Sequence, residues 1–295
     1  MLCRTVARMQ FAAMFRLLRL PLSLMVAGTA MAGALIMPER PAGFTLWALG
    51  WGVFLLAAAS SVLNQVQERA SDALLRRTRQ RPLASGLLSP GSGTALGLLL
   101  GSGGFAILAL GTGTGSTLLG MAALAWYLAV YTPLKRLSSM AVLAGTPCGA
   151  IPPLMGWLAA GGTLPDPQPF ALALFMLLWQ VPHYWLLALP ERDELRTAGF
   201  RVLPELTDRQ LLAISHRWIL GLALITLLLP MLSLPGTPLP QGILVALAIT
   251  LAIMSSWFRH RGLFAVNAAW RLRRLLYLHL ALTLLVLCVD ALISV

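Results

Sequence analysis

The sequence predicts an all-α integral membrane protein, a bundle of about nine transmembrane helices. Of its 295 residues, 58% are hydrophobic and only 11% are charged, and the mean hydropathy is +0.79. A soluble domain of this length would not carry so few charges on its surface. Because a helix needs roughly 20 apolar residues to cross a bilayer, we expect spans at residues 18–37, 43–63, 94–112, 115–133, 139–160, 168–190, 211–233, 239–258 and 273–294.

The connections between the spans alternate between two kinds. The first, third, fifth and seventh spans are followed by short connections built of helix breakers: Pro38 to Gly43, Gly111 to Gly115, Gly161 to Pro169 and Pro235 to Pro240. The second, fourth, sixth and eighth spans are followed by longer connections rich in arginine. Glycine crowds the third and fourth spans, and the fifth contains Pro152-Pro153, which we expect to break its helix and open a wall of the bundle.

The positive charges predict how the chain lies in the membrane. Short loops rich in lysine and arginine stay in the cytoplasm, and Arg40 alone lies on the side of the breaker-rich connections. We therefore expect the N-terminus and the charged loops to face the cytoplasm in a cell inner membrane. The net charge of +12 follows from this topology, so a nucleic-acid partner is not needed to explain it.

We interpret the chain as a single domain, residues 1–295, with a short basic N-terminal segment at 1–17. That segment lacks the features of a secretory signal; a mitochondrial transit segment, and so the mitochondrial inner membrane, is the alternative. The three cysteines show neither disulfide nor zinc-site spacing.

A first polar cluster continues the second span. Residues four apart lie on one face of a helix, so Asn64, Glu68, Asp72 and Arg76 form a stripe of oxygen ligands that ends in a cation. Magnesium prefers carboxylate oxygens together with substrate phosphate, and the arginines beyond the stripe suit the remaining phosphate oxygens. The alternative is a solvated helix whose charges pair with each other and with lipid heads. The depth of Asn64, directly after an apolar run, favours a functional role.

A second polar cluster, Glu191 to Arg196, follows the sixth span. The two clusters together hold five of the ten carboxylates. In a bundle, the two loops can face each other over one cavity. Carboxylates interleaved with arginines are what a magnesium-bound diphosphate requires, and ionisable groups at the ends of membrane helices indicate a functional site.

These residues resemble a known family, the UbiA superfamily of membrane prenyltransferases. The first cluster, with Arg77-Thr78-x-x-Arg81-Pro82-Leu83, is similar to its first acidic motif. Three further stretches are similar to the haem-farnesylating branch of that family: Tyr131 to Trp157 with Lys135-Arg136, Trp179 to Pro204 with Pro182-His183, and the C-terminal Arg273-Arg274-Leu-Leu-Tyr277. The resemblance covers nearly the whole chain.

The resemblance implies nine helices around a central cavity, with both acidic loops on the cytoplasmic side. It implies that farnesyl diphosphate and haem b are the substrates, that haem O and diphosphate are the products, and that Mg²⁺ is the cofactor. A downstream haem A synthase is a candidate partner. Magnesium would be held by Asn64, Glu68, Asp72, Asp193 and Glu194, and the diphosphate by Arg77, Arg81, Lys135 and Arg136, with Asn64, Glu68, Asp72 and Lys135 as the catalytic set.

Three residues depart from the family pattern. Glu68 stands in place of an aspartate, Ala70 in place of an acid, and Leu195 in place of a tyrosine. The acceptor is therefore left open at this point. A UbiA-type enzyme that prenylates a quinone precursor or a chlorophyll-like ring is the alternative.

Aromatic residues and histidines are candidates for the rest of the cavity. A prenyl carbocation needs apolar and aromatic walls, for which Tyr131 and Trp179 are the candidates. His183 either contacts haem or hydrogen-bonds a neighbouring helix, and His279 is interpreted as structural. We expect Gly145, Gly149 and Gly156 to let helices approach closely.

Two other classes of membrane protein are alternatives to an enzyme. A transporter would carry ionisable residues at mid-membrane, whereas here they gather at the helix ends. A purely structural subunit would not need the Asn64 stripe.

Overall fold

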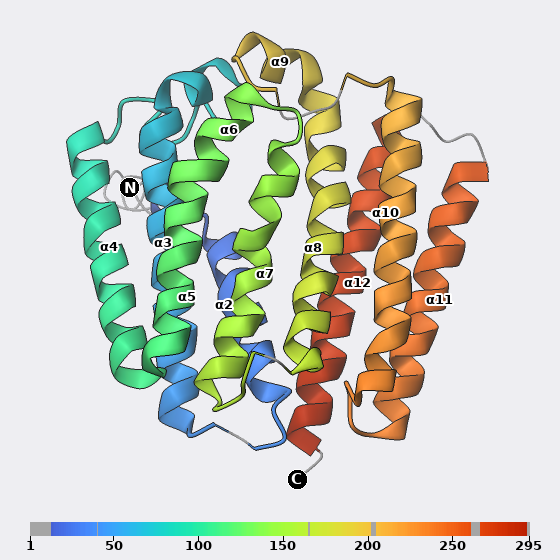
Figure 1. Cartoon of the computed structure of the whole chain (residues 1–295). Helices are drawn as coiled ribbons and strands as arrows, with labels where there is room; N and C mark the ends of the chain where they lie inside the picture. Colours follow the sequence, from blue (N-terminus) through green and yellow to red (C-terminus); the bar gives the residue numbers. More distant parts are fainter. Residues whose placement is uncertain (1–12, 40, 165, 202–204, 261–265, 294–295) are drawn as a thin grey trace, which may run out of the picture.

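The computed structural model describes residues 13–39, 41–164, 166–201, 205–260 and 266–293. Within these residues all regular structure is helical (Figure 1). The elements are α2 Leu20–Leu35, α3 Gly43–Leu74, α4 Pro90–Gly111, α5 Gly113–Trp126, a π-helical turn Tyr127–Tyr131, α6 Thr132–Leu137, α7 Ala141–Ala159, α8 Pro167–Ala188, a 3₁₀ turn Leu189–Glu191, α9 Arg192–Thr197, α10 Asp208–Leu228, a 3₁₀ turn Leu229–Leu232, α11 Pro238–His260 and α12 Val266–Ile293.

Each of the nine expected spans coincides with a helix, so the predicted fold class is confirmed. Among the residues that the structure describes, eight helical segments are long and apolar enough to cross a membrane, whereas α2, with 16 residues, is shorter. The chain is a multi-pass membrane protein. The helix α3 runs to Leu74, well past the expected end of the second span, and so carries Asn64, Glu68 and Asp72 on one helix. The expectation that Arg76 continues this helical stripe is wrong, because the helix ends before it and Leu75 is extended.

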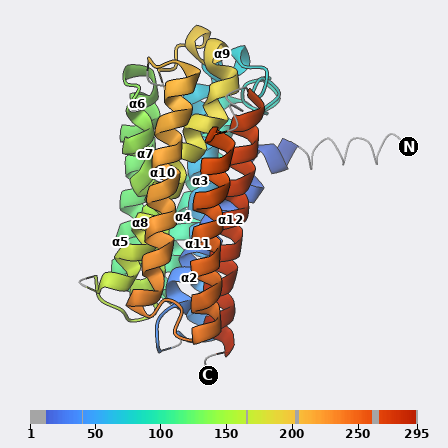
Figure 2. The same ribbon diagram turned by 90° about the vertical axis from the view of Figure 1, so that its right-hand side faces the viewer.

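The polar segments gather at one end of the bundle. The connection between α3 and α4, the short helix α6 and the helix α9 lie together at the top of Figure 1, and the chain ends at the opposite end. Viewed from the side, α10, α11 and α12 form one flank of the bundle (Figure 2). The helix α2 packs against α3, α7 and α12. It therefore lies between α3 on one side and α12 on the other.

Two helices touch backbone to backbone at the other end of the bundle. Gly33 of α2 lies against the Pro153 backbone, and Gly156 of α7 lies against the Ala30 carbonyl, so that a Cβ at either glycine would overlap the neighbouring chain. Small residues allow such close helix contacts in membranes, as expected for Gly156.

The expectation that Pro152-Pro153 breaks the fifth helix is wrong. The helix α7 is continuous through Pro147, Pro152 and Pro153. The fixed φ of proline is a helical value, so the rings remove hydrogen bonds without forcing the chain to turn. The flanking packing holds the helix together, because Pro152 and Pro153 are both buried and α7 packs against both α2 and α8.

Candidate active site

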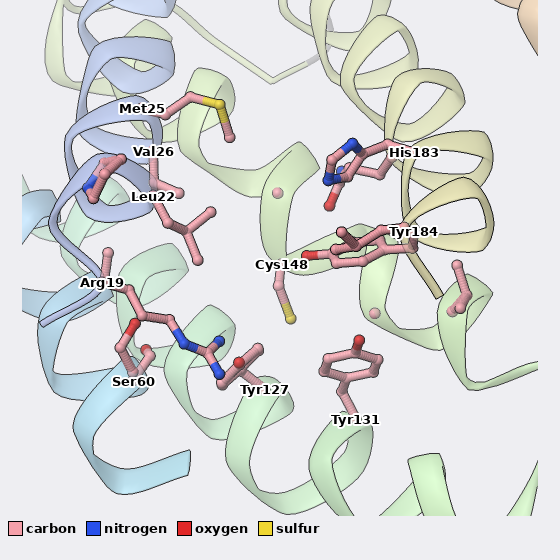
Figure 3. Close-up of a pocket in the computed structure, with 18 of the residues that line it drawn as sticks. Arg19, Leu22, Met25, Val26, Ser60, Tyr127, Tyr131, Cys148, His183 and Tyr184 are labelled. Carbon is pink, nitrogen blue, oxygen red and sulfur yellow. The ribbon is translucent and has the colours of Figure 1, made fainter. Parts of the chain in front are cut away.

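A cavity of about 900 Å³ extends from the polar end into the bundle. It is lined by side chains from α2, α3, α5, α6, α7, α8 and α12 and from the two loops that follow α3 and α8. Its lining includes Thr29 and Pro152, which are neighbours in sequence of the residues that form the contact of α2 with α7. Arg19, Tyr127, Tyr131, Cys148 and Tyr184 project into a common space (Figure 3).

Two carboxylates of the first polar cluster face this cavity. Glu68 and Asp72 are both buried and lie one turn apart on α3. Lys135 Nζ is 2.5 Å from Glu68 Oε1, and Arg81 Nη1 donates to Asp72 Oδ2 at 2.6 Å. Each acid is therefore paired with a cation that the chain brings from another element.

Asn64 lies behind the cavity and is not part of its lining. Its side chain is fully buried; its Oδ1 accepts from Arg19 Nη2 at 3.4 Å, and its Nδ2 donates to Thr132 Oγ1 at 3.2 Å. In this arrangement the amide connects α3 to the start of α2 and to α6. Asn64 thus orients Arg19.

Arg19 reaches the cavity through an unusual backbone conformation. Its φ of 45° and ψ of 53° are left-handed, which costs a residue other than glycine about 1–3 kcal/mol. The chain turns at this residue, between a short helical stretch before it and α2 after it. The turn places the guanidinium inside the bundle, beside Tyr127 (Figure 3).

The loops after α3 and α8 meet over the cavity, as the sequence predicted. Arg77 Nε lies 2.9 Å from both carboxylate oxygens of Glu191, and Arg76 pairs with Glu194. Contact with Arg76 lowers the pKa of the Glu194 carboxyl. Of these four side chains, Arg77 and Glu191 line the cavity.

Three expected site residues point elsewhere. Asp193 is exposed on α9, and neither it nor Glu194 belongs to the lining of the cavity. Arg136 is exposed and donates to Ser71 Oγ at 2.9 Å. The structure thus gathers Glu68, Asp72, Arg77, Arg81 and Lys135 at the cavity and leaves Asp193, Glu194 and Arg136 outside it.

The charged groups of the cavity suit an anion that carries a metal. Five cations, Arg16, Arg19, Arg77, Arg81 and Lys135, and three carboxylates, Glu68, Asp72 and Glu191, line it. Burial and the neighbouring Arg19 lower the pKa of Arg81 to about 10, so this side chain stays charged at neutral pH. Glu68 and Asp72 offer the hard oxygen donors that Mg²⁺ prefers, and the excess of cations offers binding groups for phosphate oxygens.

Aromatic residues line the rest of the cavity. Tyr131 lies under Lys135, whose Nζ is 4.9 Å from the ring centroid. Gly145 makes room for this ring, because a Cβ there would lie 2.6 Å from Tyr131 Cε2. On the other side, Trp179 and His183 of α8 stack with their centroids 4.5 Å apart. His279, expected to be structural, is buried and contacts Thr226 Oγ1 through Nε2 at 3.0 Å.

Sequence reasoning missed several lining residues. Arg19 was counted only in the charge balance of the membrane topology. Glu191 was overlooked because the family resemblance points to the two acids after it. Tyr127 precedes Tyr131 by one turn and Tyr184 follows His183, so helical spacing from the residues already chosen could have found Tyr127.

Comparison with known proteins agrees with this geometry. Residues 25–281 match the model of the UbiA prenyltransferase family. A protein of Geobacter sulfurreducens named "Protoheme IX farnesyltransferase" is 46% identical over 215 residues, which cover 72% of this chain and 79% of that protein. A protein of the same name from Nitratidesulfovibrio vulgaris is 36% identical over 267 residues, covering 90% of this chain and 88% of the relative.

Two solved structures share the fold. The structure of a UbiA homologue from Aeropyrum pernix superimposes with a TM-score of 0.75 at 20% identity, covering 93% of this chain and 98% of that one. A UbiA homologue from Archaeoglobus fulgidus, bound to GPP and Mg²⁺, superimposes with a TM-score of 0.67 at 13% identity, covering 93% of this chain and 99% of that one. The chain belongs to the UbiA prenyltransferase family.

Proposed function

We propose that this protein transfers the farnesyl group of farnesyl diphosphate to a vinyl group of haem b, with addition of water, to form haem O and release diphosphate. The acceptor is inferred from the two relatives above, both named for this reaction. The donor end is supported by one structural observation: cations from three segments, residues 16–19, residues 77–81 and α6, line a cavity whose other lining residues are largely apolar and aromatic.

The cations form the end of the cavity that would bind the diphosphate. Arg77 and Arg81 come from the loop after α3 and Lys135 from α6, and each is paired with a carboxylate. Breaking the allylic C–O bond builds negative charge on the leaving diphosphate. Fixed cations in a water-poor site stabilise that charge more strongly than they would in bulk water.

Glu68 and Asp72 are the residues that would hold Mg²⁺. Bound there, the metal would supply positive charge to the leaving diphosphate. Both carboxylates would then exchange their present partners, and Lys135 and Arg81 would become available to phosphate oxygens. Magnesium in the Archaeoglobus fulgidus structure supports this proposal.

The aromatic part of the cavity would shield the farnesyl carbon as it becomes positive. Tyr131 is buried and contacts Lys135, so its ring lies where the diphosphate end meets the apolar part. A ring face attracts a cation, and exclusion of water prevents hydrolysis before the vinyl group attacks.

We infer that the site faces the cytoplasm from a cell inner membrane. The inference rests on the arginine-rich connections, which lie at the cavity end of the bundle (Figure 1). A haem A synthase, which would use the product, remains the proposed downstream partner.

The decisive experiment supplies membranes containing this protein with farnesyl diphosphate, haem b and Mg²⁺. Haem O, identified by chromatography and mass, is the expected product. Parallel reactions with a quinone precursor and a chlorophyll-like ring test the alternative. Prenylation of either one, with haem unchanged, would replace haem as the acceptor and leave the prenyltransferase assignment standing.

A further inference from the structure

The cavity has two walls of different chemistry, and farnesyl diphosphate explains only one of them. The first wall, from α3, α6 and the loop after α3, carries the paired cations. The second comes from α8 and α12, on the other side of α2. It carries Trp179, His183 and Tyr277, which line the cavity. Together with Arg273, which lies one turn of α12 before Tyr277 and outside the lining, they are called the α8–α12 cluster below.

The three rings of the cluster form a rigid aromatic surface. Trp179 and His183 stack at an interplanar angle of 11°. Tyr277 meets His183 edge-on at 4.9 Å and Trp179 at 5.7 Å between centroids. The Trp179 indole donates to the Leu276 carbonyl at 2.8 Å, which fixes α8 against α12. Tyr277 is 44% exposed, so its ring is accessible to a bound molecule.

His183 carries a polar atom that no described residue satisfies. It lines the cavity and is 6% exposed, and its buried Nδ1 has no hydrogen-bond partner within the described part of the chain. Its Nε2 has a long contact of 3.4 Å with Tyr277 Oη. Buried polar atoms are nearly always satisfied in native proteins, and exceptions need an explanation. A ligand against this ring supplies one.

Arg273 lies in the same region, and no carboxylate of the described residues pairs with it. It precedes Tyr277 by one turn of α12 and is partly buried. It lies near enough to both His183 and Tyr277 to act on them electrostatically. Among the described residues it makes no ion pair and no hydrogen bond. Arg77, Arg81 and Lys135 differ from it, because each has an acid within the chain.

We propose that the α8–α12 cluster is the subsite for the acceptor, with the planar ring against Tyr277 and His183 and a carboxylate of the acceptor on Arg273. This inference rests on the proposed function. Haem b fits because it joins a large flat ring to two propionate groups. Flat rings pack against aromatic side chains, and a guanidinium binds a carboxylate through two parallel hydrogen bonds.

Haem binding without the prenyl donor tests the subsite. Full-length protein in detergent is titrated with haem b and with its dimethyl ester, and binding is followed by visible absorbance. We expect the wild type to bind the free acid about tenfold more tightly than the ester, as one charge-assisted contact predicts. Arg273→Gln removes this preference. Arg271→Gln, an exposed arginine of the same helix, keeps it.

Two further measurements separate the outcomes. His183→Ala weakens binding of acid and ester equally, because it removes ring surface and not charge. A farnesyl thiodiphosphate titration of each variant, expected to match the wild type, shows that the fold is intact. An Arg273→Gln protein that still prefers the acid overturns the subsite alone. A wild type that binds the thiodiphosphate and neither form of haem overturns haem as the acceptor.

Discussion

The two acid-rich segments of this chain both combine carboxylates with arginines after a membrane span, and they differ in the structure. Glu68 and Asp72 continue a membrane helix, are buried, and face the cavity. Asp193 and Glu194 lie on α9, where the first is exposed and the second pairs with the exposed Arg76. Both acids of the first segment therefore line the cavity, whereas of the second segment only Glu191 does. Depth in the bundle, more than the residue type, distinguishes the two.

Pairing also differs between the segments. In the Asp72–Arg81 and Glu68–Lys135 pairs the acids are buried and the cations are partly buried, and removal of one partner leaves a charge with little solvent unpaired. The pairs of the second segment are more exposed, and exposed ion pairs contribute little to stability. Substitutions in the first segment should thus have the larger effects.

Asp72→Ala has the largest expected effect. The change removes a carboxylate from the proposed metal site and leaves the partly buried Arg81 without its acid. Loss of one group that stabilises the transition state costs about 10²–10³ in rate, so we expect haem O formation in the membrane assay to fall on the order of 10³-fold. Asp208→Asn is the matched control, since that acid is 58% exposed and lies outside the cavity. Near-normal activity of Asp72→Ala would end the distinction between the two segments.

Arg81→Gln comes next. The guanidinium would bind the diphosphate, so its loss should reduce kcat/KM for farnesyl diphosphate about 100-fold, as for removal of a single charged contact. Arg81→Lys keeps the charge without the planar fork and should recover part of the loss. The KM for haem b is the internal control, because Arg81 belongs to the other wall. An equal change in both KM values would show that the walls do not act separately.

Asn64→Ala should have a smaller effect, about tenfold, because Asn64 acts through Arg19 and Thr132. The discriminating measurement is the Mg²⁺ concentration that gives half-maximal rate. We expect that concentration to be unchanged in Asn64→Ala and raised in Glu68→Gln. A similar rise in both variants would make Asn64 a metal ligand, as the family resemblance implied.

The sequence predicted the fold well because the membrane imposes a simple rule. Every span must be helical, apolar and of sufficient length, so composition alone located nine helices. The helix ends were less predictable. The bend at Arg19, which is left-handed, and the π-helical turn before Thr132 depend on packing between distant segments. The predicted helix break at Pro152-Pro153 was wrong for the same reason, since packing against α2 and α8 supports the helix.

The site was predicted in part. Helical spacing placed Glu68 and Asp72 on one face, and the arginines after them were near in sequence. The orientation of α9 could not be read from residues 191–196, because it depends on contacts with Arg76 and Arg77 of another loop. Arg19 was hidden among basic residues that set the topology, and nothing in its sequence context predicts that it enters the cavity.

Asp193→Ala has the smallest expected effect and the sharpest consequence for the comparison. The carboxylate is exposed and lies outside the cavity lining, so its loss should change haem O formation less than about threefold, as is usual for a surface substitution. Glu191→Gln is the matched variant, because Glu191 lines the cavity and holds Arg77. We expect it to have the larger effect of the two, mainly on the KM for farnesyl diphosphate. If Asp193→Ala instead lost activity as Asp72→Ala does, α9 would have to turn inward when substrate binds. The two segments would then form one site, and the structural difference between them would exist only when no substrate is bound.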